Sequence, residues 1–287
     1  MKKAKDLKLK MVLCLTVLII LALSIPPMQA LAQDADLDGF PDSLEISGFA
    51  LYDGTFYPPC TSNPPDRSTC VDPATRDLFV ILLKGDNPMN PTYGLGPSLI
   101  PANPLEFLSN PRTAGGLGVA THIILPGKVS PQYPYPDRTV TPSSSQKAVR
   151  VTESLDPSSD KLGVTTGQGM GMDESTVYTA KIKSFIISVC GTTNFDSGST
   201  LCKDSTGLTG QALLDKYIKH TIAHEIGHSL SLTGKSVKNY GGYHYNATDN
   251  VEMSQSVYYT KDSRTGQTIF YIGTGFISTD QSGFKMY

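Results

Sequence analysis

Two histidines lie four residues apart in the segment KHTIAHEIGHS, and a glutamate directly follows the first of them. These residues are His224, Glu225 and His228. On a helix, this HExxH spacing sets both imidazoles on one face, where both can reach a single zinc ion at about 2.0–2.1 Å. The glutamate is then placed to take a proton from a water molecule that the metal activates. The spacing predicts a zinc site with its own general base.

A catalytic zinc site has three protein ligands, so we expect a further ligand outside the motif. His244 is the only histidine after the motif, 16 residues beyond His228, and the glycines between them provide turns that bring the chain back. Glu252, which lies 24 residues beyond His228, is the alternative ligand. Because imidazole is a common zinc ligand, we favour His244 over Glu252.

The segment DADLDGFPDSLE, residues 34–45, carries a second set of metal-ligating groups. Its carboxylates stand at positions 1, 3, 5, 9 and 12, with a glycine at position 6, which is the spacing of an EF-hand calcium loop. Calcium prefers six to eight oxygen ligands, and alternating acidic residues let one tight turn supply them. The expected ligands are the side chains of Asp34, Asp36, Asp38 and Glu45, the carbonyl of Phe40, and Asp42 through a water molecule. The helix that precedes the loop in an EF-hand is missing, so we expect weak calcium binding that serves stability.

The first 32 residues have the pattern of a secretory signal peptide. Five lysines precede the apolar run MVLCLTVLIILALS, and ALA at residues 30–32 offers a cleavage site. The apolar run is shorter than the ~20 residues of a membrane span, so we expect secretion without stable membrane insertion. Cleavage removes five lysines and one aspartate, leaving 19 basic and 25 acidic residues. This balance argues against nucleic acid as a partner.

Four cysteines remain after the signal peptide: Cys60, Cys70, Cys190 and Cys202. An even number in an exported chain predicts disulfides, and proximity in sequence favours Cys60–Cys70 and Cys190–Cys202. The other two connectivities stay open. A zinc site of four cysteines is disfavoured, because neither pair has the short spacing that such sites use.

The elements that position these groups follow from hydrophobic periodicity. Residues 76–85 predict a buried strand, residues 119–127 a second strand and residues 147–154 a half-exposed strand, and residues 176–191 suit either a strand or a helix. A long helix is expected over about residues 209–232, because apolar side chains recur there every four residues. That apolar stripe consists of Leu214, Ile218, Ile222, Ile226 and Leu230. The motif histidines lie on the opposite side, which predicts a helix between a sheet and a cleft, in an α/β (α+β) fold.

The segments HEIGH, GGYHY and NVEMSQ together resemble the metzincin clan of zinc metallopeptidases. The resemblance implies His224, His228 and His244 as zinc ligands, Glu225 as general base, and Met253 in a turn beneath the zinc. It also implies a zincin-like mixed sheet over the motif helix, substrate along an edge strand, and a loop-rich C-terminal subdomain. Ser231 and Gly234 stand where the compact form of the clan motif has a glycine and a histidine, which leaves the subfamily open.

We therefore expect a calcium-binding loop at residues 33–46 and a metzincin-like catalytic domain at residues 47–287, acting as a secreted zinc endopeptidase on protein or peptide substrates. One alternative is a calcium-stabilised cell-surface or adhesion module whose structural zinc binds both His244 and Glu252. Another is a zinc hydrolase of non-protein amides, such as those of a cell wall. Glu225 favours catalysis over a structural site, because a structural site needs no base there.

Overall fold

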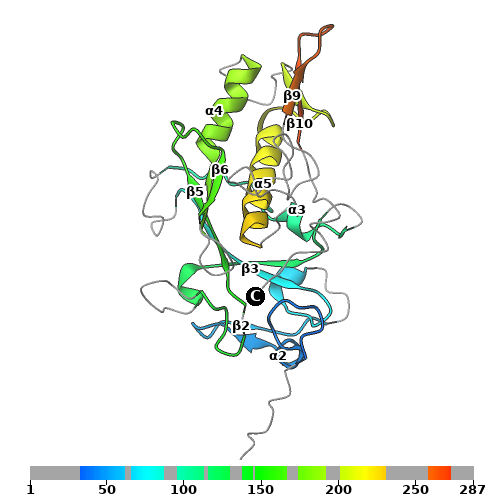
Figure 1. Cartoon of the computed structure of the whole chain (residues 1–287), viewed down its shortest axis with the longest axis vertical. Helices are drawn as coiled ribbons and strands as arrows, with labels where there is room; N and C mark the ends of the chain where they lie inside the picture. Colours follow the sequence, from blue (N-terminus) through cyan, green and yellow to red (C-terminus); the bar gives the residue numbers. More distant parts are fainter. Residues whose placement is uncertain are drawn as a thin grey trace, which may run out of the picture. The chain divides into compact units, whose positions relative to one another are not determined.

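The computed structural model describes residues 33–61, 66–86, 96–112, 116–129, 138–144, 146–166, 174–191, 201–230 and 258–272. The chain divides into two units, Met1–Gln33 and Asp34–Tyr287, and all described residues except Gln33 belong to the second. Helices and several sheets make up the second unit (Figure 1), which gives an α+β fold. Within the described ranges, no helix has both the length and the apolar character needed to cross a membrane.

A five-stranded mixed sheet forms the centre of this unit. Its strand order is β4 (Ala120–Ile124), β3 (Asp77–Leu83), β5 (Val149–Ser154), β7 (Glu174–Tyr178) and β6 (Gly163–Thr166). The first four strands run parallel, and β6 pairs antiparallel with β7 at one edge. The strands predicted at residues 76–85 and 119–127 are confirmed as β3 and β4.

The expectation that residues 147–154 form a half-exposed strand is wrong. Every residue of β5 except Arg150 is buried. The reason is position in the sheet, because β5 lies between β3 and β7 and other elements cover it. Residues 176–191 combine both expected structures, since β7 ends at Tyr178 and helix α4 (Thr179–Cys190) follows at once.

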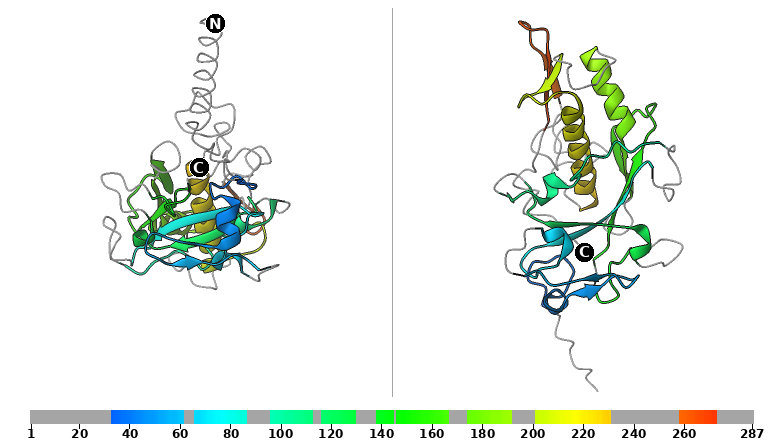
Figure 2. Two further views of the ribbon diagram at one scale, coloured as in Figure 1. Left: turned by 90° about the horizontal axis from the view of Figure 1, so that it is seen from below. Right: turned by 180° about the vertical axis from the view of Figure 1, so that it is seen from behind.

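Strand β3 is buried on both faces, which explains its uninterrupted apolar sequence. Successive side chains of a strand point to opposite faces, so β3 contributes to two separate cores. Leu78, Val80 and Leu82 pack in the core that also contains helix α5 (Gly210–Ser229). Phe79, Ile81 and Leu83 pack on the other side with the N-terminal segment, residues 34–72. Figures 1 and 2 show α5 on one side of β3 and the N-terminal elements on the other.

Helix α5 confirms the helix expected at residues 209–232. All five residues of its apolar stripe are fully buried in the core that it shares with the sheet. Burial of each such side chain stabilises the fold by about 1.5–3 kcal/mol. The helix packs against β5, β6 and β7, and α4 lies beside it. This packing fixes the rotation of α5 about its own axis, and with it the direction of the motif side chains.

The N-terminal segment covers the other face of the sheet. It contains α2 (Asp42–Ser47), the antiparallel pair β1 (Phe49–Ala50) and β2 (Phe56–Tyr57), and η1 (Arg67–Thr69). Aromatic rings dominate its core, with the ring centres of Phe40 and Phe49 4.7 Å apart. The Cys60–Cys70 disulfide links two points of this segment and confirms the first predicted pair.

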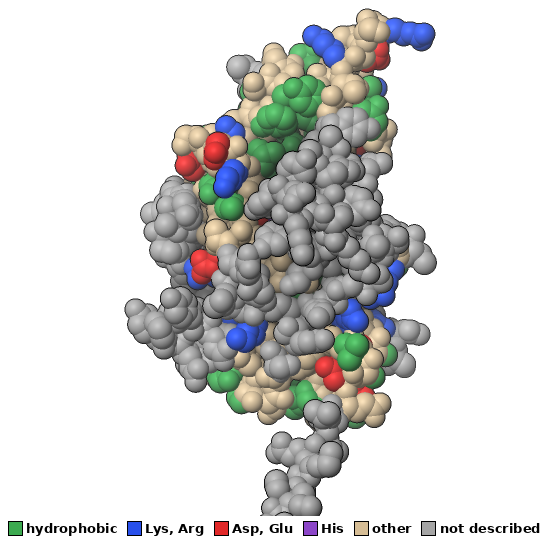
Figure 3. Space-filling view, viewed as in Figure 1, with side chains coloured by type: hydrophobic (Ala, Val, Ile, Leu, Met, Phe, Trp, Pro, Cys, Tyr) green, Lys and Arg blue, Asp and Glu red, His purple; other side chains and the backbone are tan. Residues whose placement is uncertain are grey.

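A separate three-stranded sheet combines β8 (Cys202–Asp204), which precedes α5 in the chain, with β9 (Tyr258–Lys261) and β10 (Thr268–Tyr271), which follow it. Strand β10 is central and pairs parallel with β8 and antiparallel with β9. The Cys190–Cys202 disulfide joins α4 to β8, which confirms the second predicted pair. Figure 3 shows apolar side chains gathered at the end of the molecule formed by α4 and this sheet. The remaining short elements are α3 (Glu106–Ser109) and η3 (Pro126–Lys128).

Candidate functional site

His224 and His228 lie one turn apart on α5, with their ring centres 4.7 Å apart. Their Nε2 atoms face each other at 3.2 Å. Two ligands bound at about 2.0–2.1 Å to one tetrahedral zinc ion are separated by about 3.3 Å. Both residues are partly buried. The pair therefore fits the distance that a shared zinc ion requires.

Glu225 lies beneath the edge strand β6. The residue is 4% exposed, and its Oε2 atom accepts a hydrogen bond from Oγ1 of Thr165 at 2.7 Å. A Cβ atom at Gly163, at the start of the same strand, would clash with the carboxylate of Glu225. In strand β6, Thr165 thus supplies a hydrogen-bond donor for the carboxylate of Glu225, and Gly163 leaves the space in which the carboxylate lies.

Thr165 and Gly163 do not stand out in the sequence, because nothing in their spacing relates them to the motif some 60 residues later. They are found only through the pairing of β6 with β7 and the packing of α5 against both strands. The other residues expected at this site, His244, Glu252 and Met253, lie outside the described residues. The third zinc ligand therefore stays a prediction.

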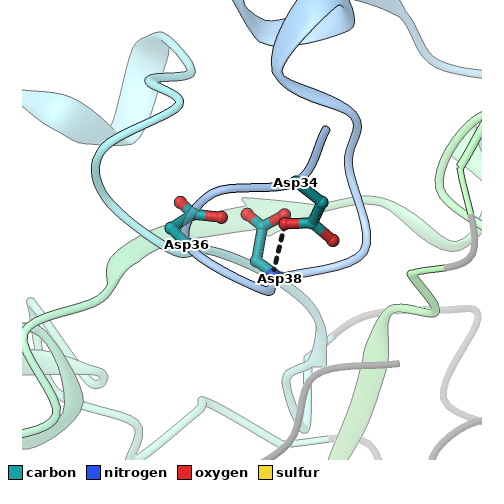
Figure 4. A group of neighbouring side chains, drawn as sticks. All are labelled: Asp34, Asp36 and Asp38. Atoms are coloured by element: carbon teal, nitrogen blue, oxygen red, sulfur yellow. Dashed lines mark hydrogen bonds between the residues drawn. The ribbon is translucent and has the colours of Figure 1, made fainter. Parts of the chain in front are cut away.

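The acidic loop is closed by the side chain of Asp34. Its Oδ1 atom accepts the N–H groups of Leu37 at 2.7 Å and Asp38 at 3.2 Å, and its Oδ2 atom accepts that of Gly39 at 3.1 Å. Leu37 and Gly39 adopt positive φ angles of 62° and 95°, which the tight turn requires. Figure 4 shows the carboxylates of Asp34, Asp36 and Asp38 converging inside this turn.

The three aspartates offer one ligand atom each, all within 4.8 Å of one another. Both carboxylate oxygens of Asp36 are buried and accept no hydrogen bond from the described residues. Phe40 is fully buried in the N-terminal core. Asp42, at position 9, accepts the N–H of Ala35 at 2.7 Å through its Oδ1 atom. The loop is therefore held in shape by its own backbone while the carboxylates crowd together.

A second acidic group includes a residue outside the loop. Asp38, Glu45 and Asp77 are each 0% exposed, and they too offer ligand atoms within 4.8 Å of one another. Asp77 is the first residue of β3, and its N–H donates to Oδ2 of Asp38 at 2.7 Å. The only signal for Asp77 in the sequence is a carboxylate at the start of a buried strand, so sequence reasoning did not connect it with the loop.

Crowding and burial disfavour the charged forms of these groups. Burial, followed by the charge of Asp34, raises the pKa of Asp36 to about 7, and burial with the charge of Asp36 raises the pKa of Asp38 to about 8. Burial and then the charge of Asp38 raise the pKa of Glu45 to about 10, and burial also raises the pKa of Asp77. A cation at this place would offset the repulsion and favour all the ionised forms.

Comparisons with known proteins identify no relative: no family model matches the chain, and neither a curated protein nor a solved structure matches it. The chemistry of both sites therefore follows from their side chains and geometry.

Proposed function

We propose that the chain is a zinc-dependent peptidase in which His224 and His228 bind the metal and Glu225 is the general base. The observation that carries the proposal is the 3.2 Å separation of the two Nε2 atoms, on the helix that also bears Glu225. Zinc, when bound, supplies the Lewis acidity that activates water and polarises a carbonyl group. The third ligand in this proposal is His244, with Met253 in a turn beneath the site, as in metzincins.

Glu225 performs the proton transfers. Its carboxylate takes a proton from the attacking water and delivers it to the amine nitrogen that leaves when the peptide bond breaks. Thr165 donates to Oε2, which limits rotation of the carboxylate, and the close approach of Gly163 keeps the edge strand directly above it. The base therefore acts from a fixed position.

Strand β6 is suited to hold a peptide substrate. It is the antiparallel edge of the main sheet, and its residues are partly or fully exposed. An extended peptide binds such an edge by adding one more strand, with main-chain hydrogen bonds that do not depend on sequence. Because Thr165 contacts Glu225 from this strand, a peptide along β6 lies beside the base. This relationship favours peptides over other amides as substrates.

The proposal also includes calcium at residues 34–45 and secretion of the mature chain. Calcium would stabilise the fold and take no part in the reaction, because the loop packs on the face of the sheet opposite to α5. The two disulfides are consistent with an oxidising compartment outside the cell.

Hydrolysis of a mixed quenched-fluorescence peptide library by residues 33–287, with zinc and calcium present, tests the proposal. The control is Glu225→Gln, which keeps the size of the side chain and removes the base. We expect cleavage by the parent chain, and its loss both in the variant and after chelation of zinc. Folded, zinc-containing protein that cleaves no peptide would contradict the proposal and favour a structural zinc site or a non-peptide amide substrate.

A further inference from the structure

We propose that the cation site of the N-terminal loop extends onto the central sheet, with Asp77 of β3 as a ligand beside Asp38 and Glu45. This inference rests on the proposed calcium binding by residues 34–45 and adds a ligand that the twelve-residue pattern does not contain. Its consequence is that the cation holds the N-terminal segment against β3.

The distances suit one shared ion. Oxygens that bind the same calcium at 2.3–2.6 Å lie up to about 5 Å apart. The ligand atoms of Asp38, Glu45 and Asp77 all fall within 4.8 Å of one another, and Asp38 also belongs to the group with Asp34 and Asp36. Asp38 therefore joins the loop carboxylates to the strand carboxylate.

Glu45 provides an independent sign of a ligand. Its side chain is fully buried, no N–H or hydroxyl group of the described residues donates to its carboxylate oxygens, and its one recorded polar interaction is with another carboxyl group, that of Asp77. A buried carboxylate without hydrogen-bond donors is costly, and its nearest polar neighbours in this group are further carboxylates. A divalent cation resolves the conflict, because it supplies the positive charge and the coordination that these oxygens lack.

Asp77 is held in a fixed orientation, as metal ligands commonly are. Its Oδ1 atom lies 2.7 Å from Nε2 of His122, and its Oδ2 atom accepts the N–H of Asp72 at 3.2 Å. Nδ1 of His122 donates to the carbonyl of Ser68 at 2.9 Å, so the fully buried imidazole is fixed at both nitrogens. Through His122, Asp77 is thus connected to η1, which contains Ser68 and lies between Cys60 and Cys70.

Hydrogen bonds that involve backbone groups also hold the loop against β3. The N–H of Asp77 donates to Asp38, and Nε2 of Gln146 donates to the carbonyl of Asp38 at 2.8 Å and to that of Asp77 at 2.5 Å. Arg76 Nε donates to the carbonyl of Asp36 at 2.5 Å. These contacts place Asp77 at the loop without a metal, which leaves the cation to neutralise the assembled carboxylates.

The rival explanation is a proton retained by Glu45 and donated to Asp77 in place of a cation. Glu45→Gln separates the two, because an amide resembles the protonated acid in shape and hydrogen-bonding capacity but is a poorer calcium ligand. Proton retention predicts a variant as stable as the parent chain and a parent chain that does not respond to calcium. Cation binding predicts that the variant loses calcium affinity.

The experiment is calorimetric titration of calcium into metal-free residues 33–287 at neutral pH, for the parent chain, Asp77→Asn, Glu45→Gln and Asp36→Asn. Asp53→Asn is the matched control, because Asp53 is a carboxylate on the same segment that pairs with Lys128 away from the cluster. We expect Asp77→Asn and Glu45→Gln to weaken calcium binding at least about tenfold. Asp53→Asn should bind calcium like the parent chain.

Three results would overturn the inference in different ways. Parent-like affinity in Asp77→Asn, with affinity lost in Asp36→Asn, would confine the site to the loop. Absence of calcium binding by the parent chain would remove the loop site as well. Thermal unfolding and circular dichroism show whether Asp77→Asn folds. If it does not, the calcium affinity of Glu45→Gln is the test, and parent-like affinity in that variant would contradict the inference.

Discussion

Thr165 of the edge strand donates a hydrogen bond to Glu225 of helix α5, with Oγ1 2.7 Å from Oε2. The Oγ1 atom of Thr165 also lies 2.9 Å from Oγ of Ser175 on the neighbouring strand β7. The proposed base, the proposed substrate strand and the sheet are thus connected through one hydroxyl group. Because that group is a side chain, its contribution can be removed without breaking the sheet.

Thr165→Val should lower kcat for peptide hydrolysis, because it removes the donor to Glu225 while keeping the branched shape of the side chain. We expect a loss on the order of 10- to 100-fold, as for other misplaced catalytic groups. Steady-state kinetics would show this as a change in kcat with KM nearly constant. Thr165→Ser should restore most of the rate.

The control for this variant is Thr166→Val on the same strand, since Thr166 is exposed and its hydroxyl bonds the carbonyl of Glu174. Full kcat in both valine variants would mean that Thr165 does not position the base.

Gly163→Ala should reduce activity more than it reduces zinc binding. An added methyl group would meet the carboxylate of Glu225, so either the carboxylate or strand β6 must shift. The apolar stripe of α5 packs in the main core and keeps the helix in place, so His224 and His228 should stay in position. The zinc content should therefore remain near that of the parent chain. Metal analysis beside a peptidase assay measures both. Gly127→Ala is the control, because a methyl group there meets no described atom within 4 Å.

The stability of the metal-free chain should fall as the pH rises. Asp36, Asp38 and Glu45 have pKa values of about 7, 8 and 10 when folded, against ordinary values of 3.8, 3.8 and 4.5. Above the ordinary values the folded chain therefore holds more protons than the unfolded chain, so folding is progressively disfavoured up to the raised values. We expect Tm to drop by about 5 °C or more between roughly pH 5 and pH 8.

Calcium should reverse that drop, because it stabilises the ionised carboxylates. Its effect on Tm should be large near pH 8 and small near pH 5, where protons already occupy the site. Thermal unfolding with calcium or a chelator at both pH values gives the comparison. An equal effect of calcium on Tm at the two pH values would contradict the idea that ionisation of these buried carboxylates causes the loss of stability.

His244→Ala should lower zinc affinity far more than Glu252→Ala does, since we assign the third ligand to His244. Competition with a coloured zinc chelator measures both affinities. The reverse order would exchange the two assignments, and similar losses in both variants would favour a closed structural site with four protein ligands.

The histidine motif and the loop carboxylates could be found in the sequence because each set lies within one turn or one helix. The spacing of His224 and His228 needs only helical geometry, and the pattern at residues 34–45 needs only one tight turn. Asp77 could not be found in this way, because its place at the loop depends on contacts between segments 39 residues apart. The same applies to Gly163 and Thr165, which meet Glu225 only through sheet pairing.

Burial was also harder to predict than element type. The alternation in residues 147–154 suits a strand with one exposed face, yet β5 is central and covered on both sides. The exposure of a strand depends on its neighbours in the sheet, and the order β4-β3-β5-β7-β6 is not contained in the local pattern of any strand. By contrast, the apolar stripe of α5 is fully buried as expected, but the helix is buried on other sides as well, where His220 and Glu225 are also covered.

The most direct measurement of the central claim is a zinc titration of the metal-free chain, with peptide hydrolysis followed at each step and calcium held constant. The account predicts that activity rises in proportion to bound zinc and stops rising at one zinc per chain. Glu225→Gln should bind the same zinc and hydrolyse the peptide at least about 100-fold more slowly. Equal hydrolysis by this variant, or activity that does not follow zinc occupancy, would contradict the account.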